Sequence, residues 1–221
     1  AASRGRALSV DRMDDEETLG MAFGKLAGEF MRVNVAPEVD AYRFSKYASW
    51  SGISSPSQAT LSNAAAILAA FDVAMAQLDA DEVPSEGRLM YIASGHFNTL
   101  KGAFTRSYVN ENGIDRRVTA LDGVEVIPVP QTRFYKGITL DAGSSASAGG
   151  FTKTSSTGRD INFMILHPSA VLQAVKHDNM KYFSPDVNQT ADAHLLQYRL
   201  YHDAFVYENH VDGVYAHIKD S

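Results

Sequence analysis

The sequence contains no cysteine, so disulfides and thiolate metal sites are excluded. It has no run of basic residues longer than the pair Arg116-Arg117, and its formal net charge is −6, so a dedicated nucleic-acid-binding surface is not indicated. No stretch approaches the roughly 20 apolar residues that span a bilayer. No signal peptide is recognisable after Ala1–Arg6, because no apolar segment follows it. We therefore expect a globular protein with no membrane partner.

The sequence also lacks the short motifs that mark common enzymes. It has no G-x-x-x-x-G-K-[ST] phosphate loop, no G-x-G-x-x-G after a strand, no H-E-x-x-H and no G-x-S-x-G. Ser94-Gly95-His96 brings a hydroxyl near an imidazole, but this triplet follows a predicted strand and is typical of a turn. We therefore expect no enzymatic activity, no catalytic residue and no cofactor.

Histidine is the residue type that most favours an enzyme. Four histidines fall close together near the end of the sequence: His194, His202, His210 and His217. In a strand, Glu208, His210 and Asp212 would share one face, and a metal needs several such ligands converging at about 2 Å. The same residues span a predicted turn, where polar side chains are expected in any case. We predict no metal site here and keep a metal-dependent hydrolase that uses these histidines as an alternative.

The first part of the sequence predicts a polar strand over 1–13 and a long helix over 14–47. Asp14 is the expected N-cap, because Glu17 follows at the spacing of a capping box. The apolar residues recur at helical spacing: Leu19, Phe23, Leu26, Phe30 and Val33. Pro37 should kink the helix. Such a helix would be about 50 Å long, so we expect a strut outside the compact part of the protein.

The predicted long helix contains glycines in its interior, and the predicted helices have acidic residues at their ends. Gly20, Gly24 and Gly28 each weaken the long helix by about 1 kcal/mol relative to alanine and leave room for another backbone to approach. The carboxylates of 14–17, and those of Asp79, Asp81 and Glu82, are interpreted as solvated helix ends.

The remaining elements alternate between helix and strand. In order, we predict a helix over 61–80 with Leu61, Leu68, Met75 and Leu78 on its apolar side, a buried strand over 88–94, a short helix over 96–101, a weak helix over 115–121, a strand over 123–130 whose prolines suggest an edge or an exit, a Gly/Ser-rich loop over 136–160, a buried strand over 161–166, a helix from Pro168 to Val175, and a final hairpin of 196–207 and 214–218 with a turn at 209–213. This order is typical of the α+β class.

Three stretches resemble a known family. They are Val10–Ala48 (VDRMDDEETLGMAFGKLAGEFMRVNVAPEVDAYRFSKYA), Phe163–Asp186 (FMILHPSAVLQAVKHDNMKYFSPD) and Tyr198–Ile218 (YRLYHDAFVYENHVDGVYAHI). Together they resemble the major capsid proteins of tailed bacteriophages or prophages with the Hong Kong 97-like fold. The resemblance covers essentially the whole chain in the right order, and it depends on the combination because no single short motif is diagnostic.

The resemblance implies a domain organisation. It places the end of an extended loop and the spine helix of a peripheral (P) domain at 1–60. It places an axial (A) domain at 61–190, with the Gly/Ser-rich loop 136–160 inside it, and strands that return to the P domain at 191–221. We expect that loop to be mobile in an isolated subunit, since its composition offers little apolar area to offset ordering.

The resemblance also implies a function and partners. The chain would be a structural head protein that self-assembles as hexamers and pentamers into an icosahedral shell around phage DNA, without sequence-specific binding. Its partners would be further copies of itself, a scaffolding protein or domain, and a portal. It would belong to the virion and be assembled in the cytoplasm of the bacterial host. The alternative within the same fold is an encapsulin-type nanocompartment shell protein.

One departure from the family concerns the beginning of the chain. Members usually begin with an N-terminal arm and an extended hairpin loop, whereas here the spine helix begins after about 13 residues. We therefore expect a processed or truncated product that remains a monomer or small oligomer on its own. The covalent cross-links of some members are not carried over, because no residues match them.

Overall fold

The computed structural model describes residues 1–17, 21–55, 59–103, 120–144 and 149–220, which form two compact units. Unit 1 consists of Ala1–Asp40, Leu140–Phe151 and Gln173–Ala204; unit 2 consists of Ala41–Thr139, Thr152–Leu172 and Phe205–Ser221. Each unit is therefore assembled from separate segments of the chain. The division into P and A domains at 1–60, 61–190 and 191–221 stays a prediction.

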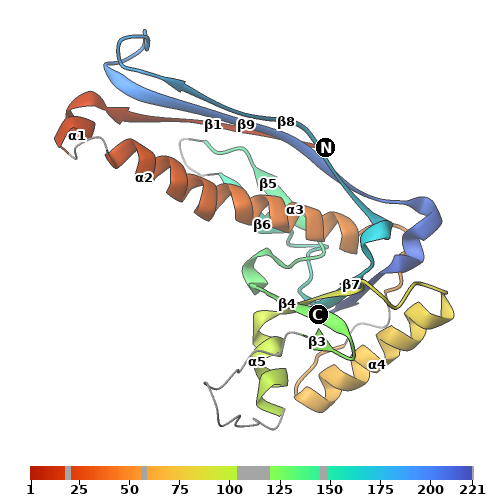
Figure 1. Cartoon of the computed structure of the whole chain (residues 1–221). Helices are drawn as coiled ribbons and strands as arrows, with labels where there is room; N and C mark the ends of the chain where they lie inside the picture. The colour runs from red at the N-terminus through yellow and green to blue at the C-terminus, as the bar shows by residue number, and fades with distance from the viewer. Residues whose placement is uncertain (18–20, 56–58, 104–119, 145–148, 221) are drawn as a thin grey trace, which may run out of the picture. The chain divides into compact units, whose positions relative to one another are not determined.

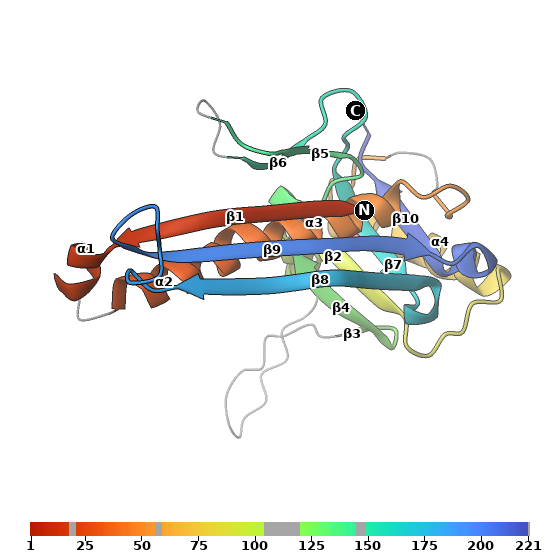
Figure 2. The same cartoon turned by 90° about the horizontal axis from the view of Figure 1, so that it is seen from above.

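A long three-stranded sheet forms one layer of unit 1. Its order is β1 (Ala2–Asp11), β9 (Ala193–Val206) and β8 (Val171–Phe183), seen side by side in Figure 2. β1 and β9 are antiparallel, from Ala2 opposite His202 to Asp11 opposite Ala193. The predicted polar strand over 1–13 is confirmed by β1.

The predicted helix from Pro168 to Val175 is wrong. Only Pro168–Ala170 is helical, as a 3-10 turn, and β8 begins at Val171. His167 is the N-cap of that short turn, because its side chain accepts a hydrogen bond from the backbone N–H of Ser169. The β-branched Val171 and Val175 favour a strand, and pairing with β9 decides the outcome.

The second layer of unit 1 is helical and consists of α1 (Arg12–Glu17), α2 (Met21–Phe30), a π-helical turn at Met31–Val35 and the beginning of α3 (Ala36–Ala48). The predicted helix over 14–47 is confirmed for the described residues. Its N-cap was misplaced, because Asp11 rather than Asp14 accepts the hydrogen bond from the N–H of Met13, at 2.9 Å.

The π-helical turn lies directly before Pro37. The N–H of Ala36 donates to the carbonyl of Met31, five residues earlier. Proline has no N–H, and in a regular α-helix its ring collides with the carbonyl four residues before it. The wider π turn accommodates the proline, so the expected kink takes the form of a single π-helical turn.

Aromatic side chains join the helix to the sheet within unit 1, where the sheet lies along α2 (Figure 1). Phe30 meets Tyr198 edge-on at 6.3 Å between ring centroids, and Phe23 lies 5.1 Å from Tyr182. Leu26 and Val33 of the predicted apolar stripe are instead exposed. The contacting face thus passes through Phe23 and Phe30, seven residues apart, and only part of the predicted stripe is confirmed.

Unit 2 is built on a five-stranded sheet of order β10-β7-β2-β4-β3, which consists of β10 (Val214–Ile218), β7 (Ile161–Leu166), β2 (Leu89–Ala93), β4 (Val124–Val129) and β3 (Ala120–Leu121). Its α-helices are the part of α3 from Ala41 onward, α4 (Ala64–Ala80), which is capped by Asn63, and α5 (Ser94–Ala103). The core is formed by side chains of α4 and of the central strands, among them Ile67, Phe71, Leu78, Ile92, Phe163 and Tyr215. The buried face of α4 is therefore centred on Ile67 and Phe71, whereas Leu68 and Met75 of the predicted face are only partly buried.

Three further predictions about elements are wrong. β10 pairs with β7 and not with β9, so the chain does not end in a hairpin; the intervening Glu208–Gly213 forms a 3-10 helix. Ala120–Leu121 is a strand paired with β4, and the rest of the helix expected at 115–121 lies outside the described residues. The predicted loop 136–160 contains the strands β5 (Ile138–Asp141) and β6 (Gly150–Lys153), which pair with each other, while 145–148 lie outside the described residues.

Candidate assembly surfaces and polar networks

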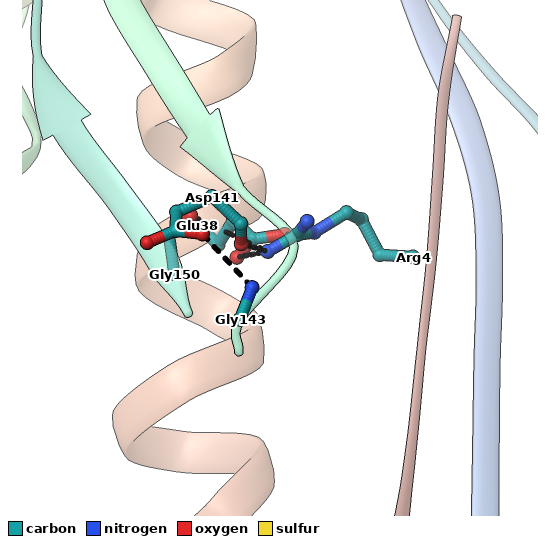
Figure 3. A network of polar contacts seen from close by, with 5 residues as sticks. All are labelled: Arg4, Glu38, Asp141, Gly143 and Gly150. Atoms are coloured by element: carbon teal, nitrogen blue, oxygen red, sulfur yellow. Dashed lines mark hydrogen bonds and ion pairs between the residues drawn. The ribbon is translucent and has the colours of Figure 1, made fainter. Parts of the chain in front are cut away.

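Arg4 is the centre of a polar network in unit 1. From β1 its Nε donates to Glu38 Oε1 at 2.6 Å and its Nη2 donates to Glu38 Oε2 at 3.0 Å. The same Nη2 also donates to the backbone carbonyls of Asp141 at 2.7 Å and Gly150 at 3.3 Å (Figure 3). The two side chains are mostly buried, with exposed fractions of 23% for Arg4 and 14% for Glu38. A guanidinium with this many partners is occupied, so it acts as a structural clamp rather than as a ligand for substrate.

The clamp fixes the facing ends of β5 and β6. The carboxylate of Asp141 accepts a hydrogen bond from the N–H of Gly143 at 2.9 Å, which closes the turn after β5. At Gly149 a Cβ would lie 3.2 Å from the N of Gly143, and its φ of +79° favours glycine. Beside the clamp is an open cavity of about 410 Å³, lined by residues of β1, β9, the end of α2 and the π turn, among them Tyr198, Phe30 and Val33.

No local pattern in the sequence identifies Arg4. Its partners lie 34, 137 and 146 residues away along the chain. An arginine in a predicted polar strand is ordinarily solvated, so Arg4 could not be recognised as a site residue from the sequence. Contacts between segments that are far apart in the sequence place it beside these partners.

The histidines near the C-terminus do not converge. His194 and His202 are in unit 1, whereas His210 and His217 are in unit 2. In the described part of the chain, no group of three or more histidine or acidic side chains is placed to hold a metal ion. Glu208, His210 and Asp212 lie in a 3-10 helix, not on one face of a strand, and all three are exposed.

His194 instead joins the sheet of unit 1 to α1. Its Nε2 lies 3.3 Å from Asp15 Oδ2, and its Nδ1 lies 2.7 Å from the hydroxyl oxygen of Tyr182. The carboxylate of Asp15 also accepts the N–H of Phe23 at 3.2 Å. Asp15 is buried, so the interpretation of this acidic run as wholly solvated is wrong.

His217 belongs to a buried chain of polar groups in unit 2. Asn162 Nδ2 lies 3.0 Å from His217 Nδ1, and Asn162 Oδ1 lies 3.0 Å from His96 Nε2. The ring of His217 stacks on Phe163 at 5.0 Å. Burial lowers the pKa of His217, and the nearby His96 lowers it further. The imidazole is therefore held in its neutral form, with Nδ1 accepting from the Asn162 amide.

The other candidate side chains from the sequence are also occupied by structural partners. Ser94 Oγ donates to the carbonyl of Val129 at 2.8 Å, while His96 bonds to Asn162, so the two do not form a nucleophile–base pair. Asp79 binds the buried Arg88 at 2.7 Å, and Asp81 accepts from the Gln77 amide at 3.1 and 3.0 Å. Among the described residues, these side chains are not arranged as a nucleophile with a base or as a pair of catalytic carboxylates.

Large apolar side chains are exposed on the surface of unit 1. β8 contributes Val175, Met180 and Tyr182, exposed by 51%, 53% and 52%. In the neighbouring strand β9, burial raises the pKa of Tyr198 to about 12, and the negative charge of the Asp178 carboxylate and a hydrogen bond to it add to this shift. Side chains alternate along a strand, so Met180 and Tyr182 lie on one face of the sheet and Val175 lies on the other. Large apolar side chains exposed along one strand are a feature of interaction surfaces. Among the described helices, none has the length and apolar character needed to cross a membrane.

Comparison with known proteins identifies the fold. No protein-family model and no curated protein matches the chain. A chain of Mycobacterium phage Che8 matches with a TM-score of 0.67 and 13% identity, over 98% of this chain and 70% of that chain. The mature capsid of bacteriophage PhiM1 matches with a TM-score of 0.61 and 13% identity, over 100% and 72%. A virus-like particle from Pyrococcus furiosus matches with a TM-score of 0.58 and 11% identity, over 98% and 76%. The predicted α+β phage capsid fold is confirmed.

Proposed function

We propose that the protein is a structural shell protein, the major capsid protein of a tailed phage or prophage. The observation that carries the proposal is the structural match to a phage capsid over the whole chain. The exposed apolar side chains of β8 support it, because a subunit that is covered by its neighbours needs such surface.

The partners follow from the proposed role. Copies of the chain would meet as hexamers and pentamers, with a scaffolding protein or domain and a portal during assembly in the bacterial cytoplasm, and the finished virion would enclose DNA. The formal net charge of −6 fits a wall that does not hold DNA phosphates strongly.

The proposal is tested by expressing the complete gene with its neighbouring genes and imaging the product by electron microscopy. We expect closed particles of uniform size. A product that stays monomeric under every condition, with or without neighbouring genes, would contradict the shell function.

The nanocompartment alternative shares the fold, and no comparison supports it better than the phage head. The contents of purified particles separate the two functions: nuclease-resistant DNA supports a phage head, whereas a packaged protein supports a compartment. Metal analysis after dialysis addresses the hydrolase alternative. Stoichiometric zinc or manganese that is lost in a His202→Ala or His210→Ala variant would contradict a purely structural role.

A further inference from the structure

β8 is a long strand at an edge of its sheet. It has 13 residues, and in the part of the chain that the structure describes its one neighbour is β9. Along its other side the backbone N–H and C=O groups are available for pairing, over roughly 40 Å at about 3.3 Å per residue. Natural proteins shorten, charge or cover such edges, because an exposed one pairs with another chain. The apolar residues exposed on β8 make a permanently uncovered edge unfavourable.

The sequence of β8 is complementary to itself in the antiparallel direction. If two copies pair with the midpoint His177 opposite its own copy, Lys176 lies opposite Asp178 on both sides of the centre. The next positions place Val175 opposite Asn179 and Ala174 opposite Met180. Toward the ends, Gln173 faces Lys181, Leu172 faces Tyr182 and Val171 faces Phe183. Opposite charges and apolar pairs directly across two strands each stabilise a sheet by about 0.2–1 kcal/mol.

Other symmetric registers are worse. A twofold axis perpendicular to the sheet keeps each residue on its own face, so the axis must pass through a residue position rather than between two. Centring on Lys176 places two lysines opposite each other, and centring on Asp178 places two aspartates opposite each other. Registers centred further out shorten the paired length. The His177-centred register is the one that pairs the full strand and satisfies the charges.

We propose that β8 is an interface at which two copies of this chain join their three-stranded sheets, antiparallel and with His177 on the twofold axis. This inference rests on the proposed shell function for its biological setting, and it names the partner as a second copy. The joined sheet has the order β1-β9-β8 in one copy continuing into β8-β9-β1 of the other. Lysines on an exposed edge strand disfavour unwanted pairing with other chains. In this arrangement Lys176 lies opposite Asp178, and Lys181 lies opposite Gln173.

The absence of cysteine from the sequence permits a direct test by single-cysteine crosslinking. In particles from the complete gene, and in the purified chain at high concentration, His177→Cys is treated with a short thiol crosslinker. We expect crosslinked dimers, because opposite Cβ atoms lie about 5 Å apart. Asp72→Cys, on the exposed surface of α4, is the control and should give no dimer.

The register is tested by mixing. Val175→Cys and Asn179→Cys, one of them carrying a size tag, should crosslink with each other but not with themselves, since like positions are about 13 Å apart along the strand. Lys176→Asp should reduce crosslinking at His177→Cys roughly tenfold, and adding Asp178→Lys should restore it. Circular dichroism checks that each variant is folded.

The outcomes separate the two proposals. Particles that form while His177→Cys stays uncrosslinked would overturn the β8 interface and leave the shell function standing. Dimers at His177→Cys in a protein that never forms particles would support the interface and contradict the shell. Equal crosslinking by Val175→Cys alone and by the mixture would overturn the proposed register.

Discussion

At the scale of single residues, a few buried polar side chains fix the geometry of both units. Arg4 connects a strand, a helix and the two facing ends of a hairpin within unit 1. Asn162 plays a comparable part in unit 2, where it joins two histidines and the carbonyl of Ala59. Removing one partner of such a group leaves the others desolvated and unpaired, which costs more than the bond contributed.

Replacement of Arg4 should therefore be costly. We expect Arg4→Ala to lower the free energy of unfolding by about 2–3 kcal/mol, since charge-assisted hydrogen bonds are lost from a mostly buried site. Arg4→Lys keeps the charge but cannot make the bidentate contact to Glu38, so an intermediate loss is expected. Urea denaturation measures both. Arg32→Ala, which removes an exposed pair with Glu29, is the control and should change stability by less than about 0.5 kcal/mol. Equal effects at the two arginines would contradict the clamp.

The buried His217 gives a pH dependence with a defined sign. Its pKa is lowered in the folded protein, so below the unfolded pKa of about 6.5 the unfolded chain takes up a proton that the folded chain does not. The free energy of unfolding should decrease as the pH falls from about 6.5 toward the lowered folded pKa.

Urea titrations between pH 7.5 and 5.5 measure this effect. In His217→Gln the free energy of unfolding should depend less on pH. His210→Gln, at an exposed position, should leave this pH dependence unchanged. An unaltered slope in His217→Gln would show that other groups account for the acid sensitivity.

At the scale of elements, the parts that could be predicted are those determined by local pattern. The long helix, the Ala-rich helix α4 and the buried strands β2 and β7 follow from apolar spacing alone. The capping carboxylate was misplaced by three residues, because Asp11 and Asp14 offer the same side chain. A helix was predicted at the start of β8 because Pro168 suits a helical first turn, and the strand pairing that overrides it is not visible in the local sequence.

The glycines of α2 give an element-scale prediction. A Cβ at Gly24 or Gly28 would meet nothing within 4 Å apart from the nearby backbone of the helix itself. We expect Gly24→Ala and Gly28→Ala each to raise the free energy of unfolding by about 1 kcal/mol, measured in urea. Gly158→Ala is the contrasting case, since its Cβ would collide with the backbone of Thr154 and should destabilise.

The variants Gly24→Ala and Gly28→Ala also test whether this face of α2 contacts another subunit. If Gly24→Ala and Gly28→Ala stabilise the chain but reduce the yield of particles, another backbone packs against these glycines, as the sequence analysis expected. A stabilised chain with full particle yield would assign the glycines no part in assembly.

At the scale of the whole molecule, the units depend on contacts between distant parts of the chain. The sheet of unit 1 and the networks around Arg4 and His194 join residues that are far apart in the sequence. For that reason the sequence indicated candidate residue types, but it could not predict which side chains contact one another. The resemblance to capsid proteins predicted the fold where local patterns could not, because it draws on the order of whole segments.

The overall charge gives a prediction for the molecule as a whole. With a formal net charge of −6, the purified chain should not retard double-stranded DNA in a mobility-shift measurement at 50–200 mM salt. Retardation that weakens steeply with added salt would show that the folded chain has a basic surface that binds DNA. It would contradict the proposal that the inner surface of the shell does not hold packaged DNA strongly.

The register that sets Ala2 opposite His202 has a consequence for the timing of folding. During synthesis β1 leaves the ribosome long before its partner exists, so this sheet cannot close until β9 has been made as well. β8 is likewise without its sheet until β9 follows it. Subunits still being translated therefore lack the finished edge, and nascent chains on one messenger are kept from joining prematurely.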